Sequence, residues 1–265
     1  MLRPVRALSV AAVSALLTLT TFFAASSAGA AGANYVALGD SYSAGVGAGS
    51  YLSDSGSCKR STNAYAYLWK NANAPSSFSF VACSGARTGD VLNNQLSALN
   101  SGTTLVSLTI GGNDAGFSST MQTCVLSSDS DCLNAVSAAE SYAENTLPGQ
   151  LDQVYSAIRS KAPNAHVVVL GYPHLYQING SCLFGIGDTK RAAINEAADT
   201  LDTVIAKRVA NAGFTFGDVR GIFAGHEICG SSSTWLHSTT WPVDESYHPN
   251  ADGQAYGYLP VFSQS

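Results

Sequence analysis

Charged side chains are scarce in this 265-residue chain: they make up 12% of the residues, and the formal net charge at pH 7 is −5. No run of lysine and arginine is present that could neutralise a nucleic-acid backbone or an anionic membrane surface. The composition therefore argues against nucleic acid as a partner. A lipid substrate remains compatible with it, because apolar area rather than charge can hold such a substrate.

The spacing typical of zinc ligands is also missing. No two cysteines form a Cys-x-x-Cys pair, and no histidines stand at the spacing of metal ligands. His226-Glu227 is not followed by the second histidine of a zinc-protease helix. We therefore expect no zinc site.

The first thirty residues have the character of a secretory signal peptide. Arg3 and Arg6 give a basic start, residues 7–25 are mostly Ala, Leu, Val and Phe, and small residues at 28–30 suit cleavage. A membrane anchor is the alternative, but five Ser or Thr residues interrupt the apolar stretch. We expect export, with residues 1–30 as the signal and residues 31–265 as a single domain.

Six cysteines follow the signal: Cys58, Cys83, Cys124, Cys132, Cys182 and Cys229. An even number of cysteines in an exported protein predicts three disulfide bonds, and fifteen pairings are possible. Cys124 and Cys132 are the pair most readily accepted, because only a short loop separates them. Sequential pairing of the other four would complete the set.

Five apolar runs predict β-strands, at residues 35–38, 78–82, 104–110, 166–171 and 214–218. Helical spacing marks the segments 188–212 and about 149–161, and Pro148 is expected to separate the latter from a helical segment at 133–147. Alternating strands and helices predict an α/β fold with a mainly parallel sheet and helices on both faces. No repeat, low-complexity block or linker divides the chain.

Small and polar residues follow the first three predicted strands: Gly39-Asp40-Ser41, Ser84-Gly85 and Gly111-Gly112-Asn113-Asp114. Each could be an ordinary turn, but in an open α/β sheet the strand ends converge on the ligand site. Ser41 would supply a nucleophilic hydroxyl. Gly85 would supply an unobstructed backbone N–H, and Asn113 would add side-chain N–H donors, which together suit ester hydrolysis.

A catalytic serine also needs a base, and the chain has five histidines. His166 begins a predicted buried strand and is expected to be structural, while His174, His226 and His237 lie in loops without distinguishing neighbours. His248 precedes Pro249, which could occupy the first turn of a terminal helix and so fix the histidine in the preceding loop. A capping or surface role is the alternative for His248.

In this order, Gly39-Asp40-Ser41, Gly85, Gly112-Asn113-Asp114 and His248-Pro249 resemble the four sequence blocks of SGNH (GDSL) hydrolases. The resemblance spans residues 34 to about 253, and the six-cysteine exported chain looks like the secreted lipases, esterases and phospholipases A1 of streptomycetes. It implies a three-layer α/β/α sandwich with a five-stranded flavodoxin-like sheet. It also implies that Ser41 is the nucleophile, that His248 is the base, and that the N–H groups of Ser41 and Gly85 and the side chain of Asn113 form the oxyanion hole.

One position departs from the family. The family usually has Asp three residues before the histidine, where this chain has Glu245, and Asp244 lies one residue further away. Either Glu245 or the main-chain carbonyl of Ser246 could orient the imidazole. We favour the carbonyl of Ser246, and hence a Ser41–His248 dyad.

The resemblance thus implies a secreted serine carboxylic-ester hydrolase that needs no cofactor and acts on acyl glycerolipids. We favour a phospholipase A1 that releases the sn-1 fatty acid, and we expect a monomer that meets glycerophospholipid at an interface without stable membrane insertion. A triacylglycerol lipase or short-chain esterase is the alternative. More remote are a polysaccharide deacetylase, disfavoured by the lack of a carbohydrate-binding module, and a binding protein, which would be expected to have lost Ser41 or His248. Phe117, Leu183, Phe184 and Ile186 could contact an acyl chain or simply pack beneath a loop.

Overall fold

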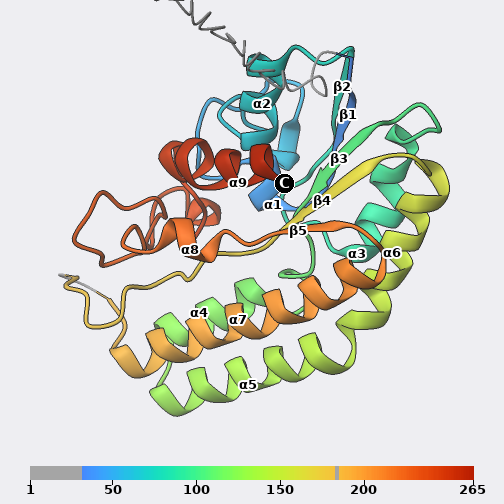
Figure 1. The fold of residues 1–265 in the computed structure, drawn as a ribbon. Helices are drawn as coiled ribbons and strands as arrows, with labels where there is room; N and C mark the ends of the chain where they lie inside the picture. Colours follow the sequence, from blue (N-terminus) through green and yellow to red (C-terminus); the bar gives the residue numbers. More distant parts are fainter. Residues whose placement is uncertain (1–31, 183–184) are drawn as a thin grey trace, which may run out of the picture.

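A five-stranded parallel sheet forms the centre of the structure, a computed structural model that describes residues 32–182 and 185–265 (Figure 1). The strands are β1 (Asn34–Ala37), β2 (Ser77–Phe80), β3 (Leu105–Leu108), β4 (His166–Leu170) and β5 (Thr215–Gly217). Their order in the sheet is β2-β1-β3-β4-β5, so the chain winds outward in both directions from β1. This is the order of flavodoxin-like sheets, in which a ligand site lies where the winding reverses, between β1 and β3. The predicted signal segment, and Leu183 and Phe184, lie outside the described residues.

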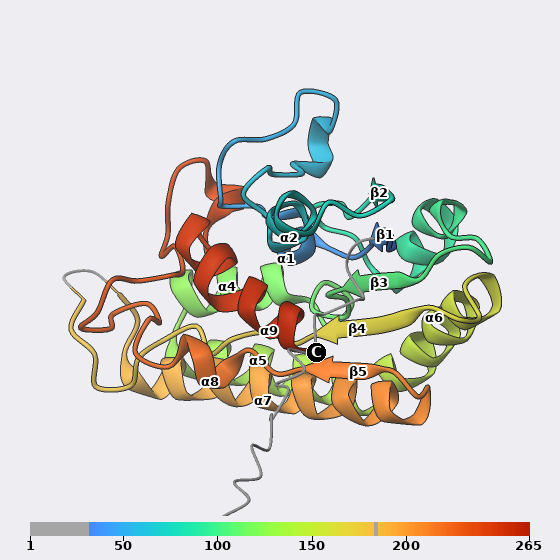
Figure 2. The same cartoon turned by 45° about the horizontal axis from the view of Figure 1, so that its top comes forward.

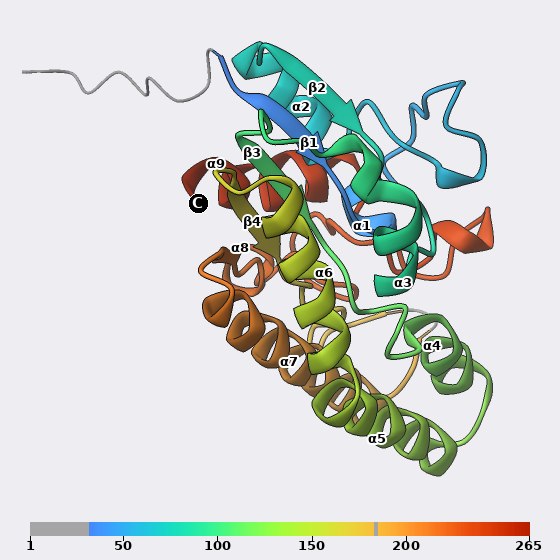
Figure 3. The same cartoon turned by 90° about the vertical axis from the view of Figure 1, so that its right-hand side faces the viewer.

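Helices cover both faces of the sheet (Figures 1 and 2). The helices are α1 (Ser41–Ala44), α2 (Tyr65–Asn73), α3 (Thr88–Asp90), α4 (Phe117–Leu126), α5 (Asp129–Asn145), α6 (Leu147–Lys161), α7 (Asp188–Asn211), α8 (Arg220–Phe223) and α9 (Leu259–Gln264). On one face lie α2 and α9, and a π-helical stretch, Gly253–Tyr258, leads into α9. On the other face lie α6 and α7, with α5 packed against α7 (Figure 3). The predicted three-layer α/β/α sandwich is thereby confirmed.

The aromatic core shows how the first face is held. Tyr35 of β1 is fully buried and packs against Trp69 of α2 and Phe262 of α9, at ring-centroid distances of 5.2 and 5.5 Å. Its hydroxyl forms a 2.6 Å hydrogen bond with Ser107 of the neighbouring β3. A buried tyrosine needs such a partner for its polar end. The same residue therefore joins a helix layer to two strands.

The predicted strands agree with the observed ones to within two residues at each end. Pro148 is not a residue between the two helices; it belongs to the first turn of α6. Its missing N–H costs no hydrogen bond there, because the first N–H groups of a helix have no partner within the helix. The helix before it, α5, ends at Asn145. The predicted separation of the two helices is therefore correct, and its position shifts by about two residues.

Three disulfide bonds join the cysteines in sequential order: Cys58–Cys83, Cys124–Cys132 and Cys182–Cys229. The first attaches the loop before α2 to the end of β2, and the second ties the end of α4 to the start of α5. Within residues 32–182 and 185–265, no helix is both long and apolar enough to cross a bilayer. The same residues contain no group of three or more His, Cys, Asp or Glu side chains that could hold a metal ion.

Candidate active site

Ser41 and His248 meet at the end of β1. Ser41 is the first residue of α1, and its Oγ lies 2.8 Å from Nε2 of His248. The other ring nitrogen of His248, Nδ1, lies 3.0 Å from the carbonyl oxygen of Ser246. Because a carbonyl can only accept, Nδ1 carries the proton and Nε2 is left free to accept the proton of the Ser41 hydroxyl. The arrangement has the geometry of an activated serine.

The backbone around His248 is held on several sides. The N–H of His237 donates to the carbonyl of His248, and the N–H of Tyr247 donates to the carbonyl of His237, both at 3.0 Å. The hydroxyl of Tyr42 donates to the carbonyl of Tyr247 at 2.7 Å, and the Tyr42 ring lies 5.2 Å from the imidazole. The imidazole is thus fixed relative to Ser41. Burial also lowers the pKa of His248 to about 4, which keeps it neutral and able to act as a base at neutral pH.

Glu245 is directed away from the imidazole. Its Oε1 accepts a hydrogen bond from the hydroxyl of Tyr51 at 2.8 Å and lies 3.5 Å from Nζ of Lys59. Asp244 pairs with the same lysine at 2.5 Å. The structure therefore brings the carbonyl of Ser246, and not a carboxylate, to Nδ1 of His248.

The prediction that Pro249 occupies the first turn of the terminal helix is wrong. Pro249 forms an isolated β-bridge with Leu236, and the helical segment begins at Ala251. Asn250 caps that segment, since its Oδ1 accepts the N–H of Gly253 at 3.0 Å. His248 thus lies in a bend directly before this bridge, and its backbone carbonyl accepts the N–H of His237, so it is not held by the start of a helix.

Donors for a substrate oxygen come from the ends of β1, β2 and β3. In the described part of the chain, the backbone N–H groups of Ser41 and Gly85 donate no hydrogen bond. Gly85 has a φ of +76°, and a Cβ there would have no atom within 4 Å, so the space beside it is open. Nδ2 of Asn113 donates to the carbonyl of Ala86, the residue after Gly85, at 3.0 Å. The predicted oxyanion-hole residues Gly85 and Asn113 are therefore neighbours in space.

Asp40 caps the short helix that carries Ser41. Its Oδ1 accepts the N–H of Tyr42 at 3.0 Å and the hydroxyl of Thr109 at 2.5 Å, and its Oδ2 accepts the hydroxyl of Tyr172 at 2.5 Å. Burial raises the pKa of Asp40 to about 6, although these hydrogen bonds act in the opposite direction. Gly39, before it, approaches β3 so closely that a Cβ would lie 2.6 Å from the carbonyl oxygen of Thr109. Ser41 therefore follows a tightly packed residue pair that is fixed by hydrogen bonds to the neighbouring strands.

Tyr172 joins two parts of the site and was not anticipated from the sequence. It follows β4, its hydroxyl bonds to Asp40 beneath Ser41, and the same oxygen accepts the N–H of Gly112 at 3.3 Å. Gly112 belongs to the strand end that carries Asn113. Tyr172 comes just after an apolar strand, as do Ser41, Gly85 and Asn113, so the same pattern could have identified it. A tyrosine at such a position is, however, more often a core residue.

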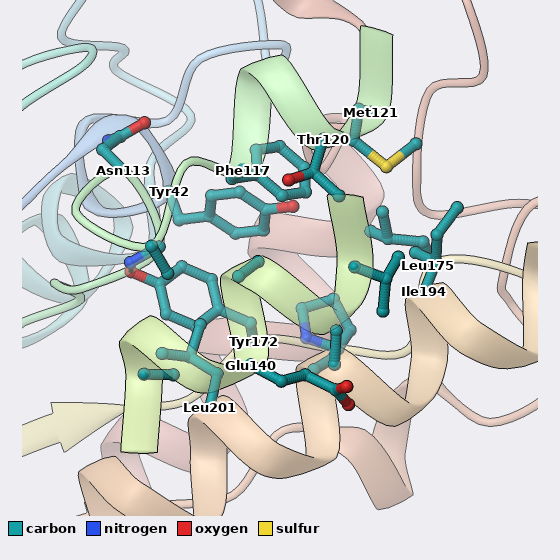
Figure 4. Close-up of a pocket in the computed structure, with 18 of the residues that line it drawn as sticks. Tyr42, Asn113, Phe117, Thr120, Met121, Glu140, Tyr172, Leu175, Ile194 and Leu201 are labelled. Atoms are coloured by element: carbon teal, nitrogen blue, oxygen red, sulfur yellow. Dashed lines mark hydrogen bonds between the residues drawn. The ribbon is translucent and has the colours of Figure 1, made fainter. Parts of the chain in front are cut away.

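An apolar groove leads away from Ser41 (Figure 4). It runs from Asn113 past the rings of Tyr42 and Tyr172 to Met121, Leu175 and Ile194, and its empty volume, including the open mouth, is about 760 Å³. Its walls come from α4, α5, α7 and the segment after β4, and they include Phe117, Val136, Ala139, Ala143, Ala197, Ala198 and Leu201. Phe117, a candidate from the sequence, lines the groove, whereas Ile186 packs in the core.

The other histidines have separate surroundings. His166 is exposed rather than buried, and its Nε2 lies 3.1 Å from the carbonyl of Ser265. Nε2 of His174 lies 2.9 Å from Asp199, and Nδ1 of His226 lies 2.7 Å from the carbonyl of Ser233. Only His248 and His237 adjoin the site among the five described histidines, and His237 is engaged with the carbonyl of Gly47 at 2.8 Å.

Residues 37–256 match the GDSL-like lipase/acylhydrolase family. The chain belongs to this family. It is accordingly a carboxylic-ester hydrolase, and the predicted family resemblance is confirmed. The four blocks that suggested it all lie within or beside the matched range, and three of them end neighbouring strands of the sheet.

Relatives of this acylhydrolase come from Streptomyces. "Lipase 1" of Streptomyces coelicolor is 62% identical over 257 residues, which cover 97% of this chain and 94% of that protein. Among solved structures, phospholipase A1 of Streptomyces albidoflavus NA297 has 58% identity and a TM-score of 0.86, with coverage of 88% of this chain and 99% of that chain. The extracellular lipase of Streptomyces rimosus has 60% identity and the same TM-score of 0.86, with the same coverage.

Proposed function

We propose that this protein is a secreted phospholipase A1, which hydrolyses the sn-1 ester of a glycerophospholipid through an acyl-enzyme on Ser41. The observation that carries the proposal is the chain of contacts from Ser41 Oγ through His248 to the Ser246 carbonyl, with Ser41 in the lining of an apolar groove. The three disulfides and the signal-like N-terminus support export of the chain.

In the first half-reaction, Oγ of Ser41 attacks the ester carbonyl carbon while its proton passes to Nε2 of His248. The negative charge that develops on the carbonyl oxygen is met by the N–H groups of Ser41 and Gly85 and by the side chain of Asn113. Nε2–H of His248 then protonates the departing glycerol oxygen. This step releases a 2-acyl lysophospholipid and leaves the fatty acid esterified to Ser41.

In the second half-reaction, neutral His248 takes a proton from water, and the resulting hydroxide attacks the acyl-enzyme. Nε2–H returns the proton to Oγ of Ser41 as the fatty acid leaves. During both steps the imidazolium is stabilised through Nδ1–H by the carbonyl of Ser246. The partial negative charge of this carbonyl oxygen has the role that a carboxylate has in many serine hydrolases.

The groove supports an acyl chain as the bound part of the substrate. Its lining of Tyr42, Phe117, Tyr172 and aliphatic side chains from α5 and α7 offers apolar area and few charges. The choice of a phospholipid rests on similarity to the phospholipase A1 of S. albidoflavus. The relatives named as lipases favour a second candidate, a triacylglycerol lipase that uses the same residues.

Product analysis tests the proposal. Phosphatidylcholine, phosphatidic acid, triolein and p-nitrophenyl esters are offered to the enzyme, and the released lipids are identified by mass spectrometry. We expect 2-acyl lysophospholipid and the sn-1 fatty acid. Release of 1-acyl lysophospholipid, or hydrolysis of triolein with no attack on either phospholipid, would contradict a phospholipase A1.

A further inference from the structure

Two exposed apolar side chains lie on the segment that leads to His248. Trp241 is 87% exposed and Val243 is 61% exposed. Residues 228–243 contain no Asp, Glu, Lys or Arg, so no charged side chain interrupts the segment. A tryptophan with so exposed a side chain is more often part of an interaction surface than of a surface that contacts only water.

A second apolar pair ends α4. Leu126 is 73% exposed and Val125 is 36% exposed, while the first turns of the same helix carry the groove residues Phe117 and Met121. Figure 3 shows the red-orange segment before the terminal helix beside α1, and α4 further down on the same side of the sheet, toward which the strands run. Exposed apolar side chains therefore stand on two sides of the edge that carries Ser41.

We propose that Trp241 and Val243, together with Leu126, seat the enzyme on the surface of a zwitterionic lipid aggregate. This rests on the proposed function, since it names the surface through which a lipid substrate would be reached. Tryptophan suits the boundary between lipid head groups and acyl chains, because its large ring is apolar and its N–H can remain hydrated. Insertion of such side chains beside the groove would bring the acyl esters of the lipid to its mouth.

The charge around the surface selects the kind of lipid. Asp244 and Glu245 follow Val243 directly, and Asp129 and Asp131 follow Leu126. Lys59 lies beside the first pair and Lys190 lies 3.6 Å from Asp129, so the four acidic side chains outnumber these two cations and the surface keeps a net negative charge. Anionic head groups would be repelled here, whereas phosphatidylcholine would not.

Hydrogen bonds join the segment that carries Trp241 to the residues just before His248, although the segment contributes no group to the proposed reaction. The N–H of Thr240 donates to Oγ of Ser246 at 3.0 Å, and the hydroxyls of Thr239 and Tyr247 lie 2.7 Å apart. These contacts fix the segment relative to His248. The side chains of Trp241 and Val243 themselves point into solvent, so their replacement should leave the chemistry on a dissolved ester unchanged.

Tryptophan emission provides a direct binding test, because the chain has three tryptophans. Trp69 and Trp235 are buried, so Trp241 is the one whose surroundings change when a vesicle binds. With the Ser41→Ala variant, which leaves the lipid intact, phosphatidylcholine vesicles should shift the emission to shorter wavelength, and brominated phosphatidylcholine should quench it. Trp241→Phe should abolish both effects. No shift at saturating vesicle concentration, or a shift with phosphatidylglycerol vesicles only, overturns the proposal.

A kinetic comparison completes the experiment. Trp241→Ser combined with Val243→Ser should raise the phosphatidylcholine vesicle concentration needed for half-maximal hydrolysis about tenfold or more, because membrane binding scales with the apolar area inserted. Hydrolysis of dissolved p-nitrophenyl butyrate should not change. Tyr256→Ser, which removes another exposed aromatic from the terminal helix, is the matched control and should alter neither value.

The two proposals can fail separately. An enzyme that binds phosphatidylcholine vesicles through Trp241 but hydrolyses only triolein would contradict the phospholipase function and support the surface. An enzyme that releases 2-acyl lysophospholipid equally well without Trp241 and Val243 would support the function and contradict the surface. Self-association through these side chains, seen by sedimentation without any vesicle-induced shift, would also overturn the surface proposal.

Discussion

Glu245 stands at the sequence position where members of this family usually have the acidic partner of the catalytic histidine, yet its carboxylate bonds to Tyr51 and Lys59. The carbonyl of Ser246 accepts from Nδ1 of His248 in its place. We therefore expect Glu245→Ala to keep turnover within a few-fold of the unmodified enzyme. His248→Ala, the reference for loss of the base, should reduce kcat by about 10⁴ or more. A loss near 10⁴ in Glu245→Ala would mean that the carboxylate, and not the carbonyl, orients the imidazole.

Two buried groups beside Ser41 are expected to set the pH dependence of activity. Burial lowers the pKa of His248 to about 4 and raises that of Asp40 to about 6. Catalysis needs neutral His248, which is present above the pKa of its imidazole. It also needs ionised Asp40, which can accept three hydrogen bonds, and protonation removes this form as the pH falls. We expect kcat/KM for p-nitrophenyl butyrate to be level above pH 7 and to fall as the pH drops through the window from about 6 to about 4. Half-loss at pH 6.5 or above would contradict the account, because it would indicate an unperturbed histidine.

Tyr172 is expected to act as a positioning residue. Its hydroxyl bonds both to Asp40, beneath the nucleophile, and to the N–H of Gly112, beside Asn113. Tyr172→Phe keeps the ring that lines the groove and removes only the oxygen. We expect kcat to fall about ten- to a hundredfold, since a hydrogen bond to a charged group contributes about 1.5–3 kcal/mol, while KM stays unchanged. A variant with a lowered Tm and an unchanged kcat would assign the hydroxyl to stability alone.

At the scale of helices and strands, the groove between α5 and α7 is expected to set the preferred length of the acyl chain. Ala198 of α7 lines this groove, so Ala198→Phe should obstruct it without breaking the helix. We expect kcat/KM for p-nitrophenyl palmitate to fall at least about tenfold relative to that for p-nitrophenyl acetate.

Ala192→Phe is the matched control, because Ala192 lies on the same helix but is exposed and outside the groove. It should leave the ratio of the two rates unchanged. An equal loss on both esters in Ala198→Phe would indicate general damage to the site rather than a chain-length filter.

The sequence predicts the site residues at the strand ends better than it predicts the groove. Ser41, Gly85 and Asn113 follow apolar strands directly, and parallel strands bring their ends together by geometry, so these residues could be identified from local patterns. The groove could not, because it forms where α7 meets α4 and α5, and α6 and β4 separate α7 from those two helices in the chain. The helix α4, with its run of Ser-Ser-Thr, has too weak an apolar stripe to be predicted. The contact of Glu245 with Tyr51 depends on tertiary packing across 194 residues, which no local pattern contains.

For the whole molecule, the disulfides are expected to contribute unequally to stability. Cys182–Cys229 spans 47 residues of sequence and Cys124–Cys132 spans 8. If the bonds act mainly by restricting the unfolded chain, the longer loop should contribute about 1.5 kcal/mol more. Denaturant unfolding of the two paired Cys→Ala variants measures the difference. A larger loss from the Cys124–Cys132 pair would show that local strain or helix anchoring outweighs chain entropy.

The central claim for the molecule is that Ser41, activated by His248, is the nucleophile of an ester hydrolase. Covalent labelling of the folded, oxidised protein with a fluorophosphonate, followed by peptide mass spectrometry, tests it most directly. We expect one label per molecule, located on Ser41, with much slower labelling in His248→Ala and none in Ser41→Ala. Absence of labelling in the unmodified protein, or a label on a different serine, would contradict it.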